Sequence, residues 1–595
     1  MALDVSKNQS PNRLMKKGLQ APGMATLNIA SLIDAQCQEQ PASIAVTALC
    51  TPHLKPSTQP EGLRAPSSSW QDLTYGELKV KSDHLAARLS GLGFKRGMRT
   101  LLFVRPGLDF PVLVTALFKI GVTLVLIDPG MGRKNLLKAI SEVKPEAMIA
   151  VSEVFLASFL FRRRFSTVKL AVMVKDRRSL GALFKGSAVD LKSLMKGEGE
   201  AALPFETLKP LAEETCAILF TSGGTGIPKG VMYTHGIFLR QVELIQQMFG
   251  VGKQDVDMPC FPLFALFSLA LGARVIVPEL DPTRPAAADP QKLIQTIREF
   301  GVTFAGGSPA IWSKVAGYAL SKSISLPSLR SLMMFGAPVR YHLHDQFSHI
   351  LPNGTTYTPY GATECLPVAS ISGREIIEER LKDRASEGTC VGKPVAGLEV
   401  KIIRAEAKPV AKVEDMETLA VGEIGEIICK GPQVTRSYFE RPEATAKAKI
   451  KDGAQVWHRM GDMGWLDQQG RLWFCGRQAY SFSYKGQMFY SVLVEAPFNN
   501  HPEIFRTALI ALETKEGVRP ALAMERLDQQ VSLKSSARSK FLAELQALGQ
   551  TSVEGSVIKD FFLVKSFPVD ARHNIKIDRT RLGKELSRNR KGYIH

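Results

Sequence analysis

Hydroxyl groups, glycines and one lysine gather in a short polar stretch between two apolar runs. Residues 219 to 236 read LFTSGGTGIPKGVMYTHG. Glycines let the backbone adopt positive φ, so that successive amide N–H groups can converge on one anion. Thr221, Ser222 and Thr225 add hydroxyl donors, and Lys229 adds a mobile cation. The stretch is therefore typical of a loop that holds phosphate.

The order of these residues separates the loop from two commoner nucleotide-binding loops. Lys229 follows Pro228, where a Walker loop requires a glycine, and no second glycine stands where a dinucleotide fingerprint places one. An ordinary glycine-rich turn between a strand and a helix would explain any short piece of the motif. The whole run favours a phosphate loop of another kind.

Taken whole, the run resembles the phosphate loop of the adenylate-forming superfamily, which includes acyl-CoA synthetases, luciferases and the adenylation domains of peptide synthetases. The resemblance implies an enzyme that uses ATP and Mg²⁺ to form an acyl-adenylate. It also implies that the ATP phosphates are bound by Thr221, Ser222, Gly223, Gly224, Thr225 and Lys229. Gly224 departs from the many relatives that carry serine or threonine there, which removes one hydroxyl donor.

A second stretch, YTPYGATECLPVAS at residues 357 to 370, matches the same superfamily. A flat aromatic beside a glycine, here Tyr360 and Gly361, can lie against adenine. The resemblance implies that Thr363 and Glu364 are catalytic. It also implies that Glu364 binds Mg²⁺, an ion that prefers oxygen ligands. Each residue alone would more often be a core aromatic or a surface acid.

Two further stretches complete the nucleotide site that the resemblance implies. FGAPV at residues 335 to 339 places Gly336, Ala337 and Pro338 along the adenine pocket. The other stretch, HRMGDMGWLDQQGRLWFCGR at residues 458 to 477, contains Asp462 and Arg477. The resemblance implies that Asp462 binds the ribose and that Arg477 also belongs to the nucleotide site. An ionised carboxylate only accepts hydrogen bonds, which suits Asp462 to a ribose diol.

The final matching stretch, FPVDARHNIKIDRTRL, contains Lys576. By the resemblance, this lysine lies between the substrate carboxylate and the α-phosphate. An ammonium there would offset the repulsion of two anions and stabilise charge as pyrophosphate leaves. A solvent-facing lysine in a basic stretch is the alternative.

LIDPGMGRKNLL, FPLFALFSLALG and VWHRMGDMGWLDQQGRLWFCGR resemble the olefin β-lactone synthetases. This resemblance implies that a long-chain 2-alkyl-3-hydroxy fatty acid is adenylated and that its own hydroxyl then closes a β-lactone, releasing AMP. Coenzyme A is not expected. The alternatives are a fatty acyl-CoA or acyl-carrier ligase, and a nucleotide-binding scaffold without turnover.

An apolar run provides the expected walls of an acyl pocket, although such a run is more often plain core. The candidate wall residues are Phe261, Leu263, Phe264, Phe267 and Leu271, with Ile311 and Trp312 further along the chain.

Helical and extended patterns alternate along residues 28 to 151, which predicts an α/β fold with parallel sheets between helices. Short strands between glycines follow near residue 423 and indicate a small β subdomain. We expect a basic tail at 1–26, a large domain of layered α/β subdomains at 27–476, and a smaller mobile α+β domain at 477–595. The last boundary follows the superfamily, in which a Gly-Arg pair precedes the hinge.

Composition narrows the possible partners. The 595 residues carry a formal charge of +19, which permits a polyanion partner, but no zinc-finger or aromatic-basic RNA motif is present, so nucleic acid is not expected. The expected partners are a fatty acid-derived substrate and, by the resemblance, other hydrocarbon-biosynthesis enzymes.

Eight scattered cysteines without a C-x-x-C pair, and an N-terminus without a secretory pattern, favour the cytoplasm. The segment FLFRRRFSTVKL, with Arg162, Arg163 and Arg164, is consistent with a solvated helix or with contact to anionic lipid. At most a peripheral membrane contact is expected, because the most apolar segment, residues 110 to 127, is too short to span a bilayer.

Overall fold

The computed structural model describes residues 28–50, 69–174, 188–196, 204–221, 228–515, 517–569, 577–589 and 592–594. The chain divides into two compact units, each considered by itself. Unit 1 comprises the chain to Met333 with His349–Gly354 and Thr435–Pro442, and unit 2 comprises Met334–Ser348, Thr355–Val434 and Glu443–His595. The predicted boundary after residue 476 stays a prediction, and the predicted tail lies outside the described residues.

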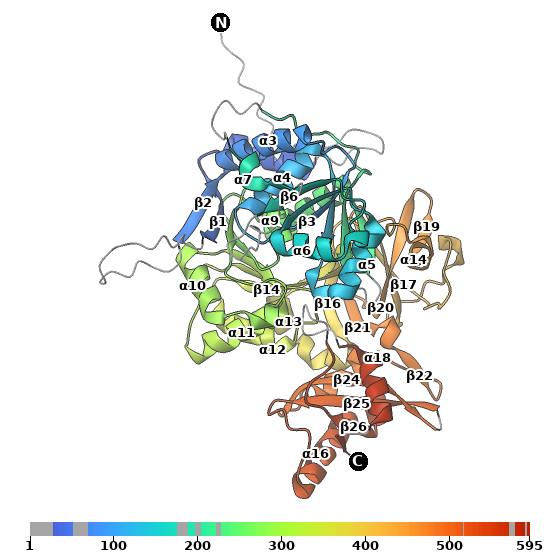
Figure 1. Cartoon of the computed structure of the whole chain (residues 1–595). Coiled ribbons are helices and arrows are strands. Elements are labelled where there is room, and N and C mark those ends of the chain that lie inside the picture. The colour runs from blue at the N-terminus through green and yellow to red at the C-terminus, as the bar shows by residue number, and fades with distance from the viewer. Residues whose placement is uncertain are drawn as a thin grey trace. The chain divides into compact units, whose positions relative to one another are not determined.

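The first half of unit 1 confirms the predicted alternation of helices and strands (Figure 1). Its elements are α2 (Ile29–Glu39), α3 (Tyr75–Gly91), β3 (Arg99–Phe103), α4 (Asp109–Ile120), β4 (Thr123–Ile127), α5 (Arg133–Val143), β5 (Ala147–Val151), α6 (Ser152–Leu160) and β6 (Leu170–Val174). Thr74 and Glu77 form a capping box that starts α3. Gly121, at φ 81°, ends α4 in the left-handed conformation that glycine adopts readily.

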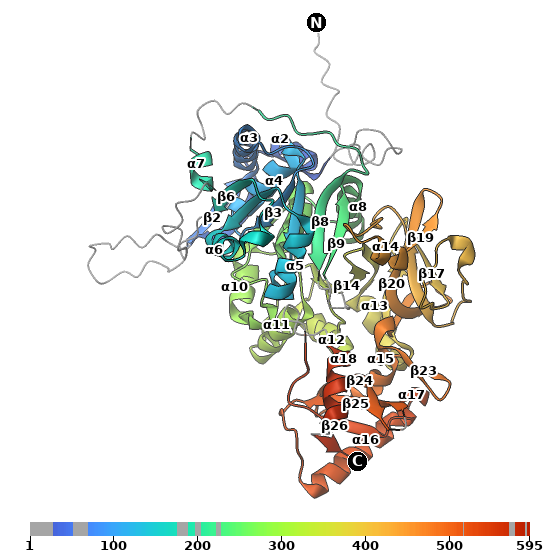
Figure 2. The same ribbon diagram turned by 45° about the vertical axis from the view of Figure 1, so that its right-hand side comes forward.

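Seven strands of unit 1 form one sheet in the order β7-β6-β5-β3-β4-β8-β9. The added strands are β7 (Val189–Asp190), β8 (Thr215–Thr221) and β9 (Lys229–Thr234). All neighbours are parallel except β8 and β9, which form an antiparallel pair (Figure 2). Side chains of β3, β4, β5 and β8 join Phe155 of α6 in one buried cluster. The sheet therefore holds the polar stretch after Thr221 at the end of a buried strand.

A second set of unit 1 strands follows the order β2-β1-β11-β10-β12. They are β1 (Ile44–Cys50), β2 (Ser69–Thr74), β10 (Val256–Pro259), β11 (Arg274–Val277) and β12 (Phe304–Gly307). The helices α8 (His235–Phe249), α9 (Ala265–Ala270), α10 (Pro290–Phe300) and α11 (Pro309–Ser321) belong to the same unit. Strands β1, β11, β10 and β12 are parallel, so their carboxyl ends meet at one edge, where α/β proteins often bind ligands.

Unit 2 contains antiparallel strands in the order β14-β15-β16-β21-β20-β18-β17, with β19 beside β20. Their bounds are β14 (Thr355–Ala362), β15 (Cys365–Ser372), β16 (Thr389–Pro394), β17 (Glu399–Ile403), β18 (Gly425–Lys430), β19 (Lys449–Asp452), β20 (Gln455–Leu466) and β21 (Leu472–Arg477). The predicted change to short strands near residue 423 is confirmed.

The last part of unit 2 is a four-stranded sheet, β24-β25-β26-β27, with helices beside it (Figure 1). Its elements are α15 (Ser491–Phe498), β24 (Ile504–Thr514), β25 (Gly517–Arg526), α16 (Ser535–Gly549), β26 (Asp560–Leu563), α18 (Arg579–Arg588) and β27 (Tyr593–Ile594). Buried side chains on both faces of this sheet form two apolar clusters, which agrees with the predicted α+β architecture.

Candidate active site

The predicted phosphate loop connects β8 to β9. Thr221 pairs with Lys229 as the last residues in register, so the strands bring both ends of the loop together. Gly230 follows, and a Cβ there would stand 2.8 Å from side-chain atoms of Ile218 and Phe220. Only glycine fits this close approach. Ser222, Gly223, Gly224 and Thr225 lie outside the described residues, as does the Thr221 side chain.

Lys229 is half-buried at the start of β9. Its Nζ lies 5.0 Å from the centre of the Tyr438 ring, a cation–π contact that positions the side chain. The segment of Tyr438 is fastened to β9 by a bridge to Val231 and by a bond from the Phe439 N–H to the Gly230 carbonyl, 2.8 Å long. The ammonium is therefore positioned beside the loop by an aromatic ring, which leaves its charge available to an anion.

Thr363 and Glu364 form the turn between β14 and β15. Ala362 pairs with Cys365, so the two residues stand at the tip of an antiparallel hairpin. Gly361 allows the hairpin to close, because a Cβ there would lie 2.7 Å from the Cys365 carbonyl oxygen. Both turn residues are half-buried and open in part to solvent.

The structure brings together three predicted nucleotide-binding residues of unit 2. The Tyr360 hydroxyl donates to Oδ2 of Asp462 over 2.6 Å, and the Arg477 Nε lies 3.1 Å from Oδ1 of the same carboxylate. Burial and the adjacent Asp462 raise the pKa of Tyr360, so the phenol stays protonated and keeps donating. Asp462 raises the pKa of Arg477 as well. The carboxyl group is thus fixed in orientation between a phenol and a guanidinium, which suits a ribose acceptor.

Gly336, Ala337 and Pro338 follow strand β13 (Ser331–Met334) as an irregular loop in unit 2. Gly336 has φ 88°, a conformation that favours glycine. Gly336 and Pro338 are exposed, so their backbone is open to a ligand.

Sequence reasoning missed Lys449, the first residue of β19. It is buried with only 6% of its surface exposed, and it pairs with His458 of β20, which pairs in turn with Cys429 of β18. Burial lowers the pKa of Lys449 to about 8, while the nearby Glu364 carboxylate opposes that shift. The sequence AKAKIK contains no signal that distinguishes this lysine from its exposed neighbours.

Glu364 fits the metal that the superfamily implies. Mg²⁺ bound with nucleotide phosphates usually takes only one or two carboxylates from the protein and keeps several waters. Within the part of the chain that the structure describes, no three His, Cys, Asp or Glu side chains form a metal-binding group. A single half-exposed carboxylate at a turn therefore suits a metal that arrives on a triphosphate, and Glu364 would hold it.

Lys576 lies outside the described residues, but both ends of its segment are fixed. Val569 and Ile577 form a bridge, and the Asp578 N–H donates to the Pro568 carbonyl over 2.8 Å. Arg579 begins α18 and pairs with buried Glu495 at 2.8 Å. Ile577, the residue that follows Lys576, is therefore held in place by its bridge to Val569.

The predicted acyl wall splits into buried and accessible residues. Phe267, Leu271, Ile311 and Trp312 are buried in the core, whereas Phe261, Leu263 and Phe264 are half-buried. Rings of Phe261, Phe264 and Phe267 contact one another in sequence at 5.6 and 5.7 Å.

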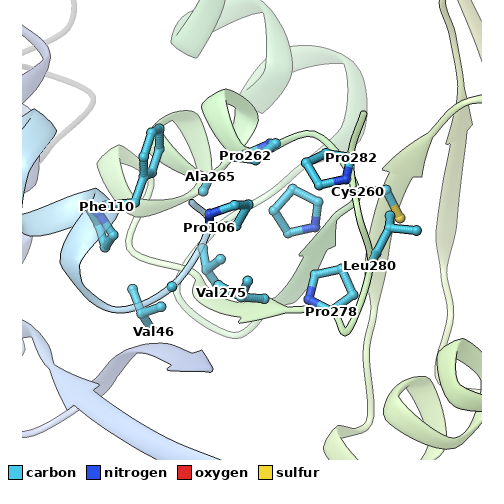
Figure 3. A pocket seen from close by; sticks show the side chains of 14 residues that line it. Val46, Pro106, Phe110, Cys260, Pro262, Ala265, Val275, Pro278, Leu280 and Pro282 are labelled. Carbon is cyan, nitrogen blue, oxygen red and sulfur yellow. The ribbon is translucent and has the colours of Figure 1, made fainter. Parts of the chain in front are cut away.

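A pocket in unit 1, partly open to solvent, adjoins this segment (Figure 3); its space, with the open solvent included, is about 450 Å³. It lies at the carboxyl ends of β10 and β11, and its walls are prolines and aliphatic side chains, including Pro106, Pro262, Ala265, Val277 and Pro278. The five predicted wall residues do not line it, although Pro262 and Ala265 lie among them in sequence. Its apolar lining is typical of a small-molecule pocket.

The comparisons with known proteins agree with these features. Residues 34–439 match the AMP-binding enzyme family. The chain is 39% identical over 569 residues to the olefin β-lactone synthetase of Xanthomonas campestris pv. campestris, covering 94% of this chain and 97% of that protein. It is 40% identical over 521 residues to the olefin β-lactone synthetase of Stenotrophomonas maltophilia, covering 86% and 90%.

Solved structures show the same fold. An amide bond synthetase from Marinactinospora thermotolerans superposes with a TM-score of 0.73 at 20% identity, covering 94% of this chain and 99% of that one. O-succinylbenzoate coenzyme A synthetase from Bacillus subtilis, in complex with AMP, gives 0.69 at 21% identity, covering 93% and 97%.

The fold and the family match define an enzyme that forms acyl-adenylates from ATP with Mg²⁺, and the predicted α/β fold is confirmed. The chain belongs to the AMP-binding, adenylate-forming family. Within it, the chain is similar to the two olefin β-lactone synthetases over most of its length.

Proposed function

We propose that this protein adenylates a long-chain 2-alkyl-3-hydroxy fatty acid and closes it to a β-lactone. The observation that carries the proposal is the similarity to two olefin β-lactone synthetases at 39% and 40% identity over most of the chain. The apolar cavity supports a fatty substrate, because its walls carry no charged side chain.

In the first step, a carboxylate oxygen of the acid attacks the α-phosphorus of ATP, and the bond to pyrophosphate breaks. In the second, the 3-hydroxyl oxygen attacks the acyl carbon, its proton leaves, and AMP departs as the lactone closes. The nucleophile is already attached to the acyl group, so the protein has to orient one substrate rather than bind a second one.

The residues take the following roles in this proposal. The loop from Thr221 to Lys229 donates hydrogen bonds and positive charge to the phosphates. Asp462, oriented by Tyr360 and Arg477, accepts bonds from the ribose. Lys576, carried by a domain of residues 477–595, neutralises the substrate carboxylate and the α-phosphate as they approach.

The direct test incubates the purified protein with ATP, Mg²⁺ and a synthetic 2-alkyl-3-hydroxy acid in the absence of coenzyme A. We expect AMP, pyrophosphate and β-lactone in equal amounts. The matched acid without the 3-hydroxyl should be adenylated but give no lactone. Strict dependence on coenzyme A would instead favour an acyl-CoA ligase.

A variant distinguishes an enzyme from a nucleotide-binding scaffold. Lys576→Ala should lower pyrophosphate release on the order of 10²-fold or more, as removal of a preorganised charge does elsewhere. Equal release by the wild type and this variant would mean that Lys576 takes no part in catalysis.

The cavity provides a test of substrate length. Ala265→Phe places a ring in the cavity, so we expect KM to rise for long-chain acids while short-chain acids keep their KM. Val80→Phe, on a side chain that is 44% exposed in the same unit, is the control. An unchanged chain-length profile in Ala265→Phe would show that the acyl chain binds elsewhere.

A further inference from the structure

Helix α6 and the turn after it form a surface that the catalytic proposal does not use. We name it the α6 patch and define it as Leu156, Phe159, Leu160 and Arg162–Arg164. The three apolar side chains are 39%, 56% and 67% exposed. Their spacing of three and four residues puts them on one face of the helix. The patch is therefore a continuous apolar stripe followed at once by three arginines.

The helix is held firmly in place by its opposite side. Phe155 is buried in the cluster formed by β3, β4, β5 and β8, and Val154 and Phe161 pack against the same cluster. The exposed side chains are therefore presented by an anchored helix.

The arginines are free of acidic partners in the part of the chain that the structure describes. Arg162 lies over the Phe159 ring at 4.8 Å, and Arg164 donates to the Ser141 hydroxyl at 2.9 Å. The one acid of α6, Glu153, is paired with Arg105 at 2.8 Å. Among the described residues of unit 1, no acidic side chain therefore pairs with the three arginines.

Neighbouring lysines extend this charge. Arg164 contacts Ser141 of α5, and Lys138 and Lys134 lie three and seven residues before Ser141 on the same helix face. Both lysines are exposed. The basic surface therefore reaches from the turn after α6 to the side of α5 that carries Lys134 and Lys138.

We infer that the α6 patch docks the protein on an anionic lipid surface. Leu156, Phe159 and Leu160 would enter the interfacial layer, and the arginines and α5 lysines would contact the lipid phosphates. Arg162 stacked on Phe159 keeps its charged end beside the ring, as side chains at a membrane interface do. The contact is peripheral, since no helix among the described residues is long and apolar enough to cross a bilayer.

Two strongly exposed apolar residues of unit 2 do not form such a surface with each other. Leu527 and Val553 are 62% and 71% exposed, as much as the patch residues, but they come from separate segments of unit 2. Isolated apolar side chains on a surface are common and bind nothing. These two positions therefore offer a matched control for substitutions in the patch.

The test uses co-sedimentation of the full chain with vesicles of phosphatidylcholine, alone or mixed with phosphatidylglycerol. We expect the wild type to bind the mixed vesicles, less at high salt, and the double variant Phe159→Asp with Leu160→Asp to bind at least about tenfold more weakly. The control, Leu527→Asp with Val553→Asp, should bind as the wild type does. Both double variants should retain wild-type thermal unfolding and ATP–pyrophosphate exchange.

Three outcomes would overturn the inference. They are failure of the wild type to bind mixed vesicles, equal binding by the patch variant and the wild type, and an equal loss of binding in the control variant and the patch variant. Binding to poly-glutamate but not to lipid would identify an acidic protein as the partner instead.

Discussion

Lys119 in unit 1 and Lys449 in unit 2 are both buried lysines, yet their surroundings differ. Lys119 has no exposed surface, and its Nζ lies 2.6 Å from Asp34 and also contacts Asp83. Lys79 bonds to Asp83 at 2.8 Å, so two cations and two carboxylates balance. Lys449 is accompanied by Glu364 and by cysteines, and burial lowers its pKa to about 8.

The difference shows what separates a structural charge from a functional one. The cluster around Lys119 joins α2, α3 and α4 and satisfies its own charges, so it stabilises the arrangement of these helices. Lys449 lies beside the carboxylate that we assign to Mg²⁺, and burial lowers its pKa. Buried groups with shifted pKa values are common at functional sites.

The largest expected effect concerns the balanced cluster. Lys119→Met should lower the free energy of unfolding by about 3–5 kcal/mol, because it leaves two carboxylates with only the half-buried Lys79. Denaturant unfolding measures this change. Lys79→Met is the control and should cost less than about 1 kcal/mol. A loss below that value in Lys119→Met would show that the cluster contributes little to stability.

Lys449→Met should lower the catalytic rate rather than the stability of the protein. We expect unchanged or slightly higher stability, because burial disfavours the charged form of Lys449 and methionine removes that desolvation cost. The rate of ATP–pyrophosphate exchange should fall by about tenfold, since Glu364 loses the cation beside it. Lys447→Met, at an exposed position two residues away, is the control. If Lys449→Met unfolded as easily as Lys119→Met at an unchanged exchange rate, both lysines would be structural.

Much of the fold and part of the candidate site could be predicted from the sequence. Helices and strands were expected to alternate along residues 28 to 151, and the apolar run of α4 and β4 within this range confirms the pattern. The environment of Lys119 inside that run could not be predicted, because its partner Asp34 is 85 residues away in sequence.

The contacts within the ribose site could not be predicted either, because they also join residues that are far apart in sequence. Tyr360 and Asp462 were each predicted from a local motif, but their hydrogen bond joins residues 102 positions apart. Lys449 had no motif, and its burial depends on strand pairing with His458. Local patterns therefore identified residue types at the site, whereas the charge balance around them depends on long-range pairing.

Asp257 offers the smallest expected effect and extends the comparison to a buried acid. Its Oδ2 accepts from Ser268 at 2.6 Å, and Oδ1 has no hydrogen-bond partner among the described residues. Burial, assisted by the charge of Asp255, raises the pKa of Asp257 to about 7 from 3.8. The folded state therefore binds a proton more tightly than the unfolded state. The resulting stability is complete below about pH 4 and is lost as the pH rises through 7.

Asp257→Asn cannot titrate, so the wild type should lose stability relative to this variant between pH 5 and pH 8. We expect a relative change of about 1–3 kcal/mol, measured by denaturant unfolding at each pH. Asp255→Asn is the contrast, because Asp255 pairs with Arg330 at 2.8 Å and its neutralisation should destabilise the protein. A constant difference between wild type and Asp257→Asn across this range would mean that the carboxyl does not titrate there.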